Sequence, residues 1–266
     1  MATGNSTLLP VTEKGWRRGF GNLFRSENSL RWGKNRWIMS ALIWLVVLNG
    51  FILLVAYGEA ESGKSTPAEI AAEGIAIFMT FGTIATAVGV VTGVQGAIIR
   101  EKQLGTAAWV LSKPVSRSAF VLAKMLSYSL AYLTLPLILT SLVFYGQSQM
   151  LWGQTPEVTS FLAGWLVMAL HMLFYVSFTL MLGTLFSSRG PVSAIGLGFL
   201  FGGQIFPNFL PPWATMIFPW KLSELAPALA LGQTLPPGWL IPMIATAVWT
   251  VVFVGIALWR FGREEF

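Results

Sequence analysis

Residues 100–124 read REKQLGTAAWVLSKPVSRSAFVLAK, and they place a charged segment with a proline between two long apolar runs. Leu104, Ala108 and Leu111 recur at helical spacing, while the charged side chains fall mostly elsewhere. This pattern is typical of a short amphipathic helix that lies on a membrane or against a partner. The stretch therefore predicts a helical connection, at about residues 100–113, between two membrane-spanning helices.

A proline and a serine mark the end of this connection. Pro114 disfavours helical geometry at Lys113, so we expect the connecting helix to end there. Ser116 is a residue type that caps the amino ends of helices, and it precedes the apolar pair Ala119 and Phe120. The next helix is therefore expected to begin directly after this serine.

Composition indicates a membrane protein. Apolar residues make up 55% of the 266 residues and charged residues 11%, whereas about a quarter of a soluble domain is charged. Six runs are long enough to cross a bilayer, since about 20 apolar residues span its hydrocarbon core. They cover roughly residues 37–57, 72–99, 119–145, 159–186, 191–210 and 239–260. The sequence thus predicts an all-α, polytopic membrane protein with six transmembrane helices.

The distribution of basic residues predicts the orientation. All of the 17 Lys and Arg residues except Lys64 and Lys221 fall on one side of the six predicted spans. Because short basic loops stay in the cytoplasm, both termini are expected there, with the first span kept as an anchor. This bias largely accounts for the net charge of +6, so no nucleic-acid partner is expected. The expected location is the plasma membrane, in particular a bacterial inner membrane, with the lipid bilayer as a partner.

The chain divides into a basic segment, residues 1–36, and a membrane domain, residues 37–266. In the first segment Trp16, Phe20 and Phe24 fall on one helical face, and arginines lie beside them. An amphipathic helix in the inner membrane interface explains this pattern. A basic retention segment with incidental aromatic residues explains it equally well.

Residues 58–65 read GEAESGKS and satisfy the phosphate-loop pattern G-x-x-x-x-G-K-S letter for letter. Such a loop binds nucleotides only between a buried strand and a helix, whereas this one follows a predicted span and lies on the predicted outer side. We therefore interpret it as a polar turn. The spans contain no paired carboxylates, no metal-ligand cluster and no nucleophile with a base, and the chain has no cysteine. Neither an enzyme nor a metal site is expected.

Three polar residues in the predicted spans are candidates for lining a transport pathway: Asn49, His171 and Gln204. Polar groups in a membrane tend to face protein or water rather than lipid. Hydrogen bonding between helices is the alternative role for each of them.

The segment from residue 207 to 242 is rich in proline, which divides it into pieces too short to cross a bilayer. Its apolar stretches, Trp213 to Trp220 and Leu222 to Leu231, predict re-entrant or interfacial helices on the outer side, before the last span. A plain interfacial connection is the alternative.

The segment after the second span resembles the coupling motif of type-2 ABC (ATP-binding-cassette) exporter permeases. The matching positions are Arg100, Glu101, Gly105, Thr106, Ala108, Leu111, Lys113, Pro114 and Arg117. In that family the connection between spans two and three is a coupling helix that sits in a groove of a separate ATPase subunit. The resemblance implies a cytoplasmic ABC ATPase partner that holds ATP and Mg, and a second permease subunit, in a homodimer or a heterodimer. It also implies that Glu101 offers its charge to the ATPase or to the neighbouring arginines.

The function expected from this resemblance is that of the membrane-spanning subunit of an ATP-driven exporter, with an unidentified substrate. The alternative is a nonconducting membrane scaffold that anchors the partners of a larger complex. A secondary transporter is disfavoured, because the spans carry almost no charge for proton or sodium coupling.

Overall fold

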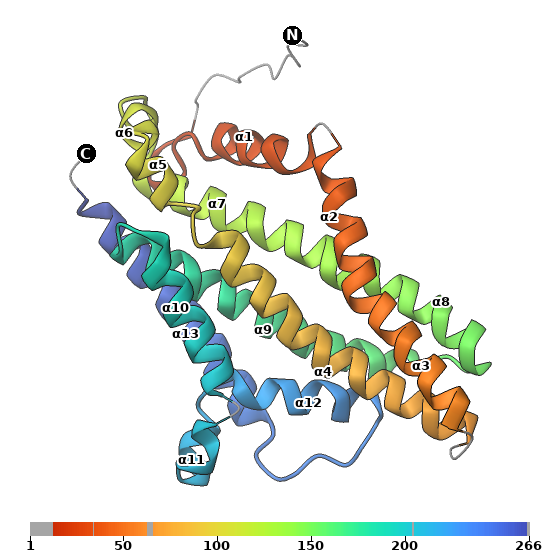
Figure 1. Cartoon of the computed structure of the whole chain (residues 1–266). Helices are drawn as coiled ribbons and strands as arrows, with labels where there is room; N and C mark the ends of the chain where they lie inside the picture. The colour runs from red at the N-terminus through yellow and green to blue at the C-terminus, as the bar shows by residue number, and fades with distance from the viewer. Residues whose placement is uncertain (1–12, 34, 63–65, 204, 265–266) are drawn as a thin grey trace.

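The computed structural model describes residues 13–33, 35–62, 66–203 and 205–264, and the side chains of these ranges apart from residues 59–62. Every regular element in these ranges is a helix (Figure 1). The predicted all-α class is therefore confirmed for the described part of the chain.

Five helices in the described ranges are long and apolar enough to cross a membrane: Arg36–Gly58, Pro67–Gln103, Arg117–Trp152, Val158–Leu185 and Leu240–Gly262. Several of them are built from consecutive elements. The first contains α2 (Arg36–Trp44), η2 (Leu45–Gly50) and α3 (Phe51–Ser62), and the second contains α4 (Pro67–Val94) and α5 (Ile99–Gln103). The third contains α7 (Arg117–Tyr132), η3 (Leu133–Leu139) and α8 (Thr140–Trp152). The last two are α9 (Val158–Leu185) and α13 (Leu240–Gly262).

The prediction of six spans is not confirmed. The apolar run at residues 191–210 forms α10 (Arg189–Gly202), which has 14 residues. A helix of that length rises about 21 Å, less than the roughly 30 Å of a hydrocarbon core. Even so, α10 carries the chain from the end of the bundle where α9 finishes toward the end where α13 begins (Figure 1).

The helix α9 lies at the centre of the bundle. It packs against α4, α7, α10, α12 (Leu222–Ala230) and α13. Its large side chains Phe174 and Tyr175 are fully buried. Exposed large side chains on α9 are confined to its amino-terminal part and its last residue, and they include Leu162 and Leu166. An apolar helix that is buried over most of its length must be enclosed by other helices, and α9 therefore organises the core.

The amino end of α9 depends on one carboxylate. Glu157 caps it by accepting hydrogen bonds from the N–H groups of Thr159, at 3.0 Å, and Ser160, at 2.6 Å. The Thr159 hydroxyl group also donates to this carboxylate at 2.6 Å. Together these bonds, the Thr159 hydroxyl first, lower the pKa of Glu157 from 4.5 to about 2.

A carboxylate with a lowered pKa stabilises the folded state above its unfolded pKa and loses that effect as the pH falls toward the folded value. We therefore expect amide hydrogen exchange in the first turn of α9 to be slow above pH 5 and to lose its protection between about pH 4.5 and 2. Glu157→Gln should abolish this extra pH dependence. Equal profiles for the variant and the wild type, after correction for intrinsic exchange, would contradict the prediction.

One end of the bundle collects segments that are distant in sequence. It holds α1 (Phe20–Trp32), α6 (Thr106–Leu111), the start of α7 and the end of α13 (Figure 1). The Arg117 guanidinium group donates to the carbonyl of Gly262 across this end at 2.7 Å. The first and the last described parts of the chain therefore lie on the same side of the bundle.

Proline and serine residues set several helix boundaries. The connection does stop being helical before Pro114, and the Ser116 hydroxyl group accepts from the Ala119 N–H at 2.9 Å, so both boundary predictions are confirmed. The segment at residues 213–220 is not one helix but the short turns α11 (Pro212–Thr215) and η5 (Pro219–Lys221), because Pro219 interrupts it. Residues 58–62 continue α3 rather than forming a polar turn, and residues 63–65 lie outside the described ranges.

Candidate functional site: the α5–α6 hairpin

The predicted helix at residues 100–113 is in fact two short helices. Gly105 separates α5 from α6 and has a φ angle of 68°. This left-handed conformation is open to glycine at little cost and ends a right-handed helix. The connection is therefore a small helical hairpin, which we call the α5–α6 hairpin.

The apolar side chains of this hairpin divide into two groups. Ala107 is buried, and Ala108 and Leu111 are half-buried. Leu104 and Trp109, in contrast, have exposed fractions of 64% and 66%. The predicted apolar stripe of Leu104, Ala108 and Leu111 is thus wrong at Leu104, because the break at Gly105 turns α6 relative to α5.

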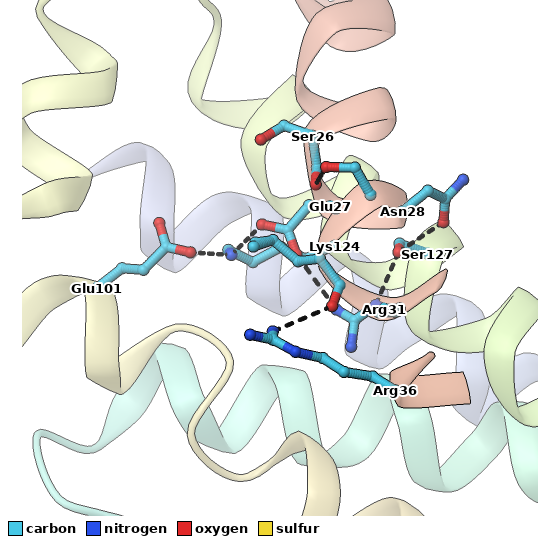
Figure 2. A network of polar contacts seen from close by, with 10 residues as sticks. Ser26, Glu27, Asn28, Arg31, Arg36, Glu101, Lys124 and Ser127 are labelled. Carbon is cyan, nitrogen blue, oxygen red and sulfur yellow. Dashed lines mark hydrogen bonds and ion pairs between the residues drawn. The ribbon is translucent and has the colours of Figure 1, made fainter. Parts of the chain in front are cut away.

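A buried lysine fixes the hairpin to the bundle. Lys124 of α7 has an exposed fraction of 3% and forms ion pairs with two carboxylates, Glu101 of α5 and Glu27 of α1, the latter at 2.5 Å (Figure 2). Arg31 also pairs with Glu27, so two cations balance the two carboxylates of this cluster. The lysine therefore joins three helices that are distant in sequence.

Arg31 extends this network along α1 and α7. Its Nη2 lies 3.2 Å from Glu27, and its Nε donates to the Ser127 hydroxyl group at 2.7 Å (Figure 2). Ser127 in turn donates to Asn28 at 2.8 Å. The guanidinium carbon of Arg31 also lies 3.2 Å from the centre of the Tyr128 ring. The predicted amphipathic segment thus includes a helix, α1, which is held against α7 by charged and aromatic contacts.

A second set of contacts ties α5 to the ends of α9 and α13. Lys102 donates to the carbonyl of Thr184, at 3.1 Å, and pairs with Glu264 at 3.0 Å. Gln103 donates to the carbonyl of Ser187 at 2.9 Å. A lysine at the carboxyl end of a helix is favourable, because it complements the helix dipole. The hairpin is therefore held from both sides while its tip stays exposed.

The other predicted coupling residues lie on the surface of the hairpin or beside it. Arg100, Thr106, Pro114 and Arg117 are exposed. Lys113 is exposed as well, and its ammonium group lies 5.1 Å from the centre of the Trp109 ring. A hollow of about 320 Å³ lies next to this surface and is lined by Ala108, Leu111, Ser112, Val115 and Arg117.

Three residues of this site carried no predicted role. The sequence did contain a signal for Trp109, because it is a large apolar residue that lies outside the predicted apolar stripe. Lys124 ends the stretch at residues 100–124, but its two ion pairs could not be predicted from spacing. Nothing in the sequence marked Glu27, which lies 97 residues from Lys124.

Asn49 lies in the wide π-helical turn η2 and is buried. Its amide nitrogen donates to the carbonyl of Thr140, at 3.0 Å, and to the side-chain oxygen of Gln147 at 2.8 Å. Pro136, inside η3, marks a matching irregular turn in the facing span. The amide therefore bridges two spans at the place where both helices widen.

We expect Asn49→Ala to lower the free energy of unfolding by about 1 kcal/mol, the usual worth of an interhelical hydrogen bond in a membrane. Val46→Ala, at an exposed position in the same turn, is the matched control. Denaturant titration in mixed micelles measures both. A larger loss in the control would show that the amide does not bridge the spans.

Of the other two candidate pathway residues, the structure describes His171 but not Gln204. His171 has an exposed fraction of 2%, and its ring centre lies 4.9 Å from that of Tyr175 on the same helix. Its Nδ1 has no hydrogen-bond partner among the described residues. The side chain thus lies inside the bundle rather than on an open surface. Gln204 lies outside the described residues.

A comparison with known protein families places most of this chain. Residues 37–266 match the model of a family described as "Protein of unknown function (DUF2705)". The chain belongs to this family. No curated protein matches the sequence. The matched region contains Glu101 and Lys124 but not Glu27, so the lysine links the family region to the segment that precedes it.

Proposed function

We propose that this DUF2705 protein is the membrane-spanning permease subunit of an ATP-driven exporter of the ABC type. A separate cytoplasmic ABC ATPase supplies ATP and Mg, and both termini of the permease lie in the cytoplasm. The observation that carries the proposal is the α5–α6 hairpin, whose exposed Leu104 and Trp109 project from a firmly held base. An exposed apolar pair on a polar surface is a typical contact point for a partner protein.

The contacts of the hairpin suit it to transmit motion. A displacement of the tip acts through Glu101 on Lys124, and so on α7 and α1. It acts through Lys102 and Gln103 on the ends of α9 and α13. Packed helices move as stiff units, so closure of the ATPases would tilt several spans together.

The pathway of such a permease would lie between two subunits. Asn49 and His171 are buried within one subunit, so neither faces open space there. Gly198 is on the exposed side of α10, and a Cβ atom added there would meet nothing within 4 Å outside its own helix backbone. Small residues permit close approach of helices in membranes, so α10 is a suitable contact for a second permease subunit.

The same burial supports a second candidate function. If Asn49 and His171 serve only to hold helices together, the protein is a nonconducting membrane scaffold. In that case the hairpin would anchor a partner without moving any substrate.

The decisive experiment is purification of the tagged protein from its native membranes in mild detergent, followed by identification of its partners. We expect an ABC ATPase to co-purify with the wild type. Leu104→Ala plus Trp109→Ala should reduce the retained ATPase at least severalfold, because interface aromatic residues often contribute 2 kcal/mol or more. Trp16→Ala, which removes another exposed tryptophan, should retain it.

Two outcomes would contradict the permease proposal. The first is the absence of any ATPase under conditions that preserve other complexes, which favours the scaffold. The second is equal retention of the ATPase by the double variant and by the control. ATPase activity that responds to added substrate would favour transport over anchoring.

A further inference from the structure

A pocket of about 270 Å³ lies on the side of α1 that faces α2 and α7, away from the exposed tip of the hairpin. Its walls come from the carboxyl ends of α1 and α7 and from α2 along its length, with single residues from α4 and η3. Arg31, Arg36 and Ser40 contribute polar groups to it, and Trp37, Tyr128 and Trp44 contribute aromatic surface. The pocket thus combines two guanidinium groups with aromatic walls.

Arg31 is a fixed part of this wall. The contacts with Glu27, Ser127 and Tyr128 hold its guanidinium group in one place. A group that is already ordered loses little side-chain entropy when a ligand binds. Its charge, however, is partly balanced by Glu27.

Arg36 supplies the unbalanced charge. It donates one long hydrogen bond, 3.4 Å, to the carbonyl of Leu30 (Figure 2). Among the described residues, no carboxylate forms an ion pair with it. Arg36 also opens α2, whose amino end has no side-chain cap. The positive end of the helix dipole therefore adds to the charge of the side chain.

The two guanidinium groups suit an anionic ligand, and the surroundings of Arg36 indicate what kind of molecule would carry the anion. The exposed residues that follow it on α2 and η2 are apolar, and they include Met39, Leu42, Ile43 and Val46. Tryptophan and arginine are typical of the boundary between headgroups and hydrocarbon. An occupant that places an anion at Arg36 and hydrocarbon along α2 satisfies both surfaces.

We infer that this pocket binds the phosphate group of an anionic phospholipid, with the acyl chains lying against α2. Arginine suits this role because its planar guanidinium group forms paired hydrogen bonds with phosphate oxygens. The site is independent of the proposed ATPase contact, since it lies on a different surface and needs only the isolated protein in lipid.

The test is a thermal unfolding series on the purified protein in neutral detergent. Dioleoylphosphatidylglycerol should raise the unfolding midpoint in a saturable way, because a ligand that binds only the folded state stabilises it. Zwitterionic dioleoylphosphatidylcholine should raise it less, and inorganic phosphate should have no comparable effect. Arg36→Gln should weaken the apparent affinity for the anionic lipid about tenfold, as the loss of one charge-assisted hydrogen bond predicts.

Arg263→Gln is the matched control, because it removes one exposed positive charge at the same end of the bundle. It should keep the wild-type affinity. Equal weakening in both variants would overturn the inference and show only general attraction between charges. A full effect from inorganic phosphate would overturn the assignment to a lipid. Ser40→Trp keeps both arginines and fills the pocket, so it provides the same test if Arg36→Gln fails to fold.

Discussion

Replacing Lys124 with methionine is expected to lower the free energy of unfolding by about 3 kcal/mol, the range found when one partner of a buried ion pair is removed. The physical reason is that the two partly buried carboxylates would lose the counter-ion that they share. Glu27 would keep only Arg31, and Glu101 would have no ion pair among the described residues. Methionine has a similar volume, so the loss would reflect charge rather than a cavity. Denaturant titration in mixed micelles measures the change.

Two further variants test whether the loss of stability comes from the removed charge rather than from a general disturbance of the fold. Lys113→Met removes an exposed lysine from the connection between α6 and α7 and should change the free energy by no more than about 0.5 kcal/mol. Adding Glu27→Gln and Glu101→Gln to Lys124→Met should recover part of the loss, because the two repelling charges are removed together. A Lys124→Met variant as stable as Lys113→Met would show that the ion pairs contribute nothing to stability.

A second large effect is expected where α12 crosses α9. A Cβ atom added at Gly164 would lie 2.8 Å from the Cβ of Ala230 and 3.2 Å from its backbone nitrogen, and it would also meet the carbonyl of Ala226 closely. Backbone atoms cannot move aside as a flexible side chain can. We therefore expect Gly164→Ala to lower the free energy of unfolding by about 2 kcal/mol, as overpacking usually does.

Gly146→Ala is the matched control for this prediction. Gly146 also lies within a helix, α8, but an added Cβ would meet nothing within 4 Å. The alanine should therefore stabilise the protein by up to about 1 kcal/mol through helix propensity. Opposite signs for the two substitutions are the expected result. If both variants gained stability, α12 would not be packed as closely on α9 as the structure has it.

Features that depend on strong local signals were predicted correctly. The long apolar runs at residues 37–57 and 159–186 predicted helices correctly, because hydrophobicity sustained over about 20 residues leaves few other structures. The end of the connection before Pro114 and the cap at Ser116 were also correct, since both depend on neighbouring residues alone. The run at residues 191–210 was less reliable, because apolar composition does not fix where a helix ends.

The sequence predicted where the candidate site lies in the chain, but not how its helices are arranged. The stretch at residues 100–124 indicated a special connection, yet a single helix was expected where Gly105 divides it into two. Periodicity cannot reveal such a break, because glycine is tolerated inside helices at moderate cost. The exposure of Leu104 and Trp109 follows from that break together with the packing of the hairpin.

The sequence by itself determined that this is an all-helical protein with several apolar helices of membrane-spanning length, because such composition and periodicity are properties of consecutive residues. Only the tertiary structure decided that Lys124 joins Glu101 to Glu27, that Asn49 bridges two spans and that Arg36 faces a pocket without a carboxylate partner among the described residues. These contacts join residues tens of positions apart in the chain. Their partners depend on how the helices pack, and packing is set by the whole chain rather than by any one segment.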